Sequence, residues 1–177
     1  MTIKRRSILK LVHWTMVPLF VWFVLVGPPQ AHALGPWGFL LHSNLALLFV
    51  VLCLAWTADF LWRGLATTRT PKLPGWAKRV HWWMHRTIVW GLFAVALGGF
   101  LLGLTSERLL KAGGFLPIAP PLDLERANEG IGTLHIMQFY ALGLLVVAHA
   151  AFHVWRHVRL RDNALRIMAP KPLHRFL

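Results

Sequence analysis

The chain has 177 residues, of which 56% are hydrophobic and only 14% are charged. This composition excludes a disordered or collagen-like chain, and its charged share lies well below the ~25% of an ordinary soluble domain. The net charge of +13 is confined to a few segments between long apolar runs, a distribution that is typical of a membrane protein and not of a nucleic-acid-binding domain.

Four apolar stretches predict four membrane-spanning helices in a single domain over residues 1–177. A helix needs about 20 apolar residues to cross ~30 Å of hydrocarbon. The stretches that meet this length cover approximately residues 8–26, 37–62, 80–104 and 131–155. We therefore expect an all-α, integral membrane four-helix bundle that runs up, down, up and down.

Local signals along the chain refine this expectation. The basic start, the first apolar run and residues 31–33 resemble a signal peptide, but the run is long for one, so we expect it to remain as a span. Pro18 lies inside this span and should kink it. Gly99 and Gly103 in the third span favour close helix packing. The connection over residues 105–130 contains a glycine pair and a proline cluster, and it should form a partly structured cap.

The basic residues predict the orientation. Residues 4–10, 63–86 and 156–175 together hold sixteen of the nineteen lysines and arginines. Residues 27–36 hold no charge, and residues 105–130 hold three basic residues against four acidic ones. The positive-inside rule then places both termini in the cytoplasm.

The sequence excludes several kinds of site. Cys53 is the only cysteine, which excludes a disulfide framework, a zinc site made of cysteines and covalent c-type haem attachment. His81 and His85 have the i, i+4 spacing of a zinc-binding helix, but no Glu follows His81, so the metalloprotease motif fails. No nucleophile–histidine–acid triad or catalytic pair of carboxylates is visible.

Histidines mark two depths in the predicted bundle. Eight of the ten histidines lie within or at the ends of the spans, where ionisable side chains are costly and are usually functional. His135 and His149 are separated by about 21 Å of helix rise and nearly four turns, so they share a face. His42 lies at the depth of His135, and His13 lies at the depth of His149. Two imidazoles from facing helices suit the iron of a b-type haem, so we predict two haem-binding pairs.

Other histidines leave alternatives open at the cytoplasmic end. They are His81, His85, His153 and His157. His153 could replace His149 as a haem ligand, and His85 could replace His13. All four could instead be interfacial residues in a basic rim, or they could donate hydrogen bonds to a quinone headgroup. At the opposite end, the side chains that could pair haem carboxylates are Arg108, Lys111 and Arg126.

Functions of other classes also fit the histidines. A haem-free metal carrier or sensor would use the same histidine stripe, and a purely structural anchor would use none of it. A pyridine haemochrome spectrum separates these hypotheses, because only a dihaem protein gives two haems per chain.

At this point the pattern resembles the bacterial cytochrome b561 family over nearly the whole chain. The matching features are His13 early in the first span, His42 early in the second, His135 and His149 in the fourth, and the tail 161–170. The resemblance implies a multi-pass protein of the inner membrane with two haem b groups, held by His13 with His149 and by His42 with His135. It also implies that electrons are exchanged with ubiquinone.

The resemblance leaves the details of function open. Family members often carry a His-His pair where this chain has Arg156 and His157, and His153 is additional here. His85, His153, His157 and Arg156 are therefore assigned only to the surroundings of a quinone or a haem. Such proteins include quinone-linked superoxide oxidases and membrane cytochrome subunits of dehydrogenases or hydrogenases. We expect a quinone-linked oxidoreductase whose partners are the lipid bilayer, quinone and a periplasmic electron donor or acceptor of unknown identity. We expect no nucleic-acid partner. The sequence does not decide whether the protein forms a homodimer.

Overall fold

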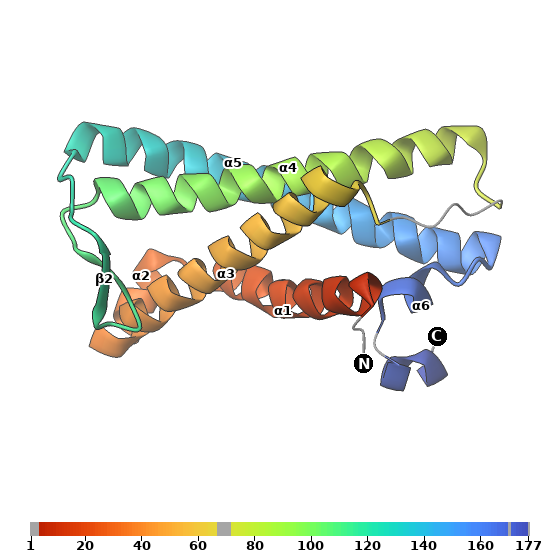
Figure 1. Ribbon diagram of the computed structural model, residues 1–177, viewed down its shortest axis with the longest axis horizontal. Helices are drawn as coiled ribbons and strands as arrows, with labels where there is room; N and C mark the ends of the chain where they lie inside the picture. The colour runs from red at the N-terminus through yellow and green to blue at the C-terminus, as the bar shows by residue number, and fades with distance from the viewer. Residues whose placement is uncertain (1–3, 67–71, 170, 177) are drawn as a thin grey trace.

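Four long helices form one bundle, with a β-hairpin at one end and both chain termini at the other (Figure 1). The computed structural model describes residues 4–66, 72–169 and 171–176. The long helices are α1 (Arg5–Leu25), α3 (Pro36–Arg63), α4 (Gly75–Thr105) and α5 (Glu125–Trp155). Each is long and apolar enough to cross a membrane. The predicted all-α membrane bundle is therefore confirmed, and we refer to the end with the termini as the cytoplasmic end, following its charge.

Two of the helices extend beyond the apolar runs that predicted them. Helix α4 begins at Gly75 instead of near residue 80, and α5 begins at Glu125 instead of near residue 131. Helix α5 also continues as a π-helical turn, Arg156–Leu160. The added turns contain charged residues, because a helix can continue past the hydrocarbon layer into the polar interface, where hydropathy no longer marks it. Helix α1 runs through Pro18 without interruption, and the kink there stays a prediction.

Proline and glycine set the boundaries of the second span. A short helix that the sequence did not predict, α2 (Pro28–Ala33), starts on a proline pair. Gly35 then adopts a φ of +88° directly before Pro36, the first residue of α3. Proline suits this position because its missing N–H would have no helical partner there. Gly64 ends α3 with a φ of +68°, a conformation that glycine adopts without strain.

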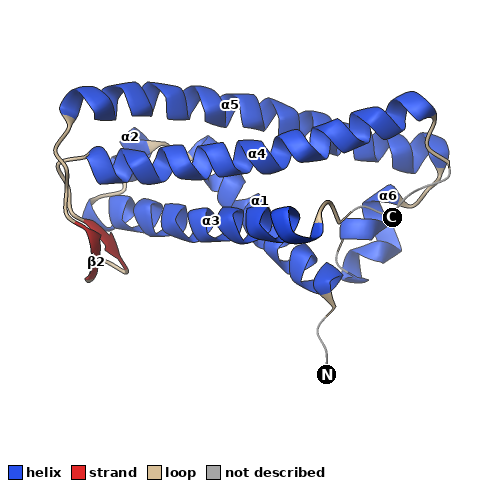
Figure 2. Cartoon of the chain, turned by 45° about the horizontal axis from the view of Figure 1, so that its top comes forward, coloured by secondary structure: helices blue, strands red, loops and turns tan. Residues whose placement is uncertain are grey.

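The connection between α4 and α5 contains the β-hairpin seen in Figure 2. Strands β1 (Leu110–Ala112) and β2 (Leu116–Ala119) pair in antiparallel fashion. The turn between them uses Gly113 and Gly114, both with positive φ. The backbone N–H of Gly113 donates a hydrogen bond of 2.6 Å to the side-chain oxygen of Asn44 on α3. The connection is thus a partly structured cap over this end of the bundle, as predicted.

The C-terminal tail folds back across the cytoplasmic end, where α6 (Ala164–Met168) lies near the start of α1 (Figure 1). Lys10 of α1 donates a hydrogen bond to the Ala169 carbonyl, and Lys72 donates one to the Arg161 carbonyl. A final 3₁₀ turn covers residues 171–176. The tail is thereby attached to both α1 and the connection before α4. Pro170, the last residue of the tail motif, lies outside the described residues.

Candidate functional site

The bundle encloses two cavities at two depths. The larger, about 1280 Å³, lies toward the hairpin, and its wall includes His42 from α3 and His135 from α5. The smaller, about 230 Å³, lies toward the cytoplasmic end, and its wall includes His13 from α1 and His149 from α5. Each predicted pair of histidines therefore shares one cavity. That these side chains bind iron stays a prediction.

The larger cavity has room for a large cofactor. Its volume exceeds the ~300–1,000 Å³ of ordinary ligand pockets. Arg108 and Lys111 lie on its wall among the described residues, whereas Arg126 does not. The Arg108 guanidinium lies 5.0 Å above the ring of Phe39. Acidic side chains lie on the same wall, those of Glu107, Asp123, Glu125 and Glu129. The cavity thus combines apolar residues with charged ones, among which Arg108 and Lys111 could pair the carboxylates of a haem.

Two adjacent glycines of α4 make room for the imidazole of His135. A Cβ atom on Gly98 would lie 3.1 Å from Nδ1 of His135, and one on Gly99 would lie 3.1 Å from its Cε1. Both distances are tighter than ordinary van der Waals contact, so a larger residue would push the ring. Gly103 faces Leu110 of the hairpin instead. The predicted close packing thus occurs at Gly99, where the contact is made by the imidazole ring of His135 on the neighbouring helix.

Buried ring nitrogens belong to the histidines of both cavities. Nδ1 of His42 and Nδ1 of His149 are buried and have no hydrogen-bond partner among the described residues. His42 also packs edge-to-face against Phe23, with ring centroids 5.1 Å apart. A buried polar atom without a partner costs ~1–3 kcal/mol, which favours a bound group in its vicinity. In the larger cavity, the donor set, the glycine cradle and the volume all fit a haem.

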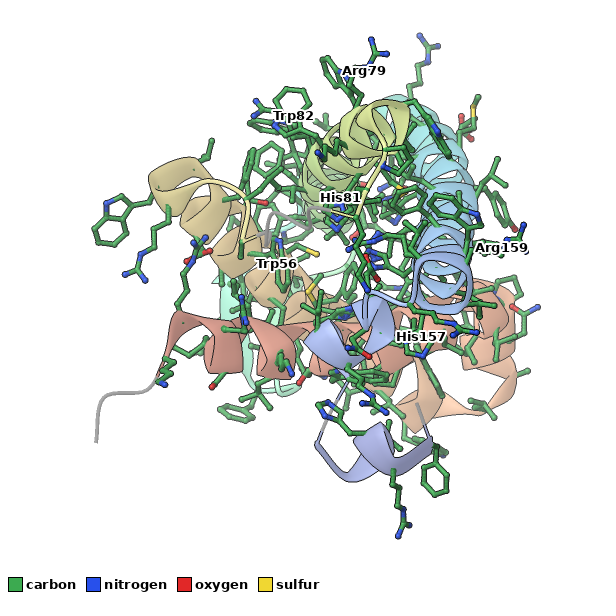
Figure 3. The ribbon with its side chains drawn as sticks, turned by 90° about the vertical axis from the view of Figure 1, so that its right-hand side faces the viewer. Trp56, Arg79, His81, Trp82, His157 and Arg159 are labelled. Atoms are coloured by element: carbon green, nitrogen blue, oxygen red, sulfur yellow. The ribbon has the colours of Figure 1, made fainter. Side chains whose placement is uncertain are left out.

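Histidines crowd the smaller cavity at the cytoplasmic end. The His149 ring lies 4.8 Å from that of His85 and 4.5 Å from that of His153, between centroids. His13 packs against Trp56 at 6.4 Å. His81 points into the bundle interior, as Figure 3 shows. The cavity is smaller than ordinary ligand pockets, so a porphyrin between His13 and His149 requires neighbouring side chains to move.

A buried ion pair lies at the wall of the cytoplasmic cavity. Arg156 lies on the cavity wall with only 1% of its surface exposed. Its guanidinium donates hydrogen bonds of 2.7 and 2.9 Å to the Asp162 carboxylate, which also accepts one from the Ala164 N–H. The sequence predicts a role for Arg156 but none for Asp162, because only the fold of the tail brings Asp162 back to the bundle. His157 lies on neither cavity wall among the described residues.

An apolar layer separates the two cavities. The buried residues of this core are Met16, Leu19, Phe49, Cys53, Leu92, Val95, Ala96 and Leu142. Phe49 is on the wall of both cavities. Phe20, on the wall of the smaller cavity, stacks on Phe139, on the wall of the larger one, with ring centroids 4.8 Å apart. The cavities are therefore separated by little more than one layer of side chains.

Comparison with known proteins decides the class of cofactor. A family model for prokaryotic cytochrome b561 matches residues 4–171. The chain belongs to the prokaryotic cytochrome b561 family. This cytochrome b561 is a multi-pass membrane protein of bacteria that binds haem b and takes part in electron transfer, and the family resemblance of the sequence is confirmed. No curated protein matches the chain. Family membership favours a haem protein over a haem-free metal carrier.

Proposed function

We propose that this cytochrome b561 of the bacterial inner membrane holds two haem b groups and conducts electrons between a periplasmic partner and ubiquinone at its cytoplasmic end. The observation that carries the proposal is the pair of cavities, each of which has one of the predicted histidine pairs, from two different helices, on its wall. One cavity would support a single redox centre on one side of the membrane. Two cavities at two depths support a path across it.

The four histidines would supply the axial ligands. His42 and His135 would hold one iron, and His13 and His149 would hold the other. Bound haem b supplies a reversible one-electron iron couple. Because the helix rise between His135 and His149 is about 21 Å, the two ligand levels are spread over much of the hydrocarbon thickness.

The apolar layer between the cavities keeps water out of the path. Phe49 is 3% exposed, and Val95 and Ala96 beside it are equally buried. A dry layer prevents ions and protons from following the electron. The short separation of the cavities across this layer supports electron passage through the bundle.

The cytoplasmic cavity would also receive the quinone. Quinone carbonyls accept hydrogen bonds, and imidazoles can donate them and deliver protons. His85 and His153 lie on the cavity wall beside His149, together with the buried Arg156, whose charge is offset by Asp162. His157 does not line the cavity among the described residues, so it would not contact the quinone directly.

Reduction by a quinol tests the proposal. Purified haem-loaded protein is mixed anaerobically with a soluble ubiquinol, and the visible haem bands are followed with time. We expect the bands of the reduced form to appear, and we expect H153Q to slow them at unchanged haem content. H174Q is the matched control, because His174 lies in the tail and lines neither cavity among the described residues. Haems that dithionite reduces but quinol leaves oxidised would contradict the quinone assignment.

A further inference from the structure

Three histidines at the cytoplasmic end form a cluster with the spacing of a metal site. His81 and His85 lie one turn apart on α4, and His153 faces them from α5. One ring nitrogen from each lies within 4.8 Å of the others. The ring centroids are separated by 4.1 Å for His81 and His85, 5.6 Å for His85 and His153, and 5.7 Å for His81 and His153.

The cluster needs only a small contraction to bind a metal ion. Zinc binds imidazole nitrogen at ~2.0–2.1 Å with tetrahedral geometry, which places ligand nitrogens about 3.3 Å apart. The widest pair in the cluster must therefore close by at most about 1.5 Å. Rotation of the imidazoles about their side-chain bonds can provide this, because two of them already share one helix face.

Two of the three rings each have a nitrogen that could bind a metal ion. Nδ1 of His85 lies 2.7 Å from the His81 carbonyl, so the tautomer that carries its proton on Nδ1 donates to this oxygen. Nε2 of His85 then keeps its lone pair for a metal, which is the usual arrangement around metal-binding histidines. Nε2 of His153 is buried without a hydrogen-bond partner among the described residues. A metal ion would satisfy it.

The charges around the cluster permit a cation. Arg156 lines the same cavity, but Asp162 lies 2.7 Å from its guanidinium and offsets its charge. The three ligands are imidazoles, which suit zinc, copper and nickel and discriminate against magnesium and calcium. All three residues line the cytoplasmic cavity, and three protein ligands are the number found in catalytic zinc sites, where water takes the fourth position.

We propose that His81, His85 and His153 bind one divalent transition-metal ion, in addition to any haem iron. Binding does not depend on the quinone assignment. If that assignment holds, a metal ion on His85 and His153 removes two hydrogen-bond donors from the quinone and slows its exchange. The two ideas can therefore fail separately.

Metal content of the haem-loaded protein tests the site. The purified protein is dialysed to equilibrium against buffered Zn²⁺, and zinc, iron and protein are measured together. Zinc is a suitable probe because it is redox-inactive and cannot exchange electrons with haem. We expect one zinc per chain in the wild type and in the H174Q control. In H81Q and in H153Q the dissociation constant should rise at least tenfold.

Haem content decides between this site and a haem site. Each variant is assayed in parallel by pyridine haemochrome, and we expect H81Q and H153Q to keep the full haem complement. Absence of bound zinc in the wild type, or a dissociation constant for zinc in H81Q or H153Q equal to that of the wild type, would overturn the proposal. Loss of haem along with zinc in either variant would also overturn it, because the residue would then belong to the haem pocket.

Discussion

The buried ion pair of the tail provides a quantitative test of the fold at the cytoplasmic end. The side chains of Arg156 and Asp162 are 2% and 1% exposed, and their closest atoms are 2.7 Å apart. D162N keeps the shape of the side chain but removes the negative charge that offsets the guanidinium. Breaking a buried pair in this way costs about 3–5 kcal/mol, which corresponds to about 10²–10⁴-fold in the unfolding equilibrium.

Unfolding of the haem-loaded protein measures this cost. The protein is titrated with denaturant in mixed micelles while its helix content is followed by circular dichroism. D59N is the matched control, because Asp59 pairs with Arg5 at 2.6 Å with side chains 29% and 22% exposed. A pair that water still reaches contributes less than a fully buried one, so D59N should lower the free energy of unfolding less than D162N does. Equal effects of the two variants would refute the assignment of a buried pair at the cavity wall.

Further predictions concern the cavities and the layer between them. H135A and H13A should each lose one haem and keep the other, which haem-to-protein ratios will show; two low-spin haems in either variant would disprove the pairing. G99A should lower occupancy of the haem near the hairpin, because its Cβ would crowd His135, whereas G132A should not, since a Cβ there makes only an ordinary contact at 3.5 Å. F49A should lower the unfolding temperature at unchanged haem content. Its cost should be smaller than the ~3–5 kcal/mol of soluble cores, because lipid also solvates the unfolded side chain; an unchanged unfolding temperature would argue against a packed layer.

The sequence predicted the four helices and the depths of their histidines for simple physical reasons. Apolar length identifies a membrane span without knowledge of its neighbours. The rise and the number of residues per turn of a helix give the difference in membrane depth between His135 and His149, and they show that both lie on one helix face. Both inferences use properties of one helix at a time, and the structure places these two side chains in separate cavities.

Features that depend on how helices rotate against one another could not be predicted. The sequence shows that His81 and His85 share a face of α4, but only packing shows that this face meets His153 of α5. The glycine cradle for His135 depends on the same rotation. The pairing of Arg156 with Asp162 depends on the left-handed conformation of Arg161 between them, which returns the tail toward the bundle. Hydropathy contains no signal for such a reversal.

The central claim is that two haem b groups occupy two levels of this bundle. The most direct measurement is the haem-to-protein ratio of the purified protein, with haem measured as pyridine haemochrome and protein by amino-acid analysis. The account predicts two haem b groups per chain, both low-spin. A ratio of one at full saturation, or a high-spin spectrum in both centres, would contradict it.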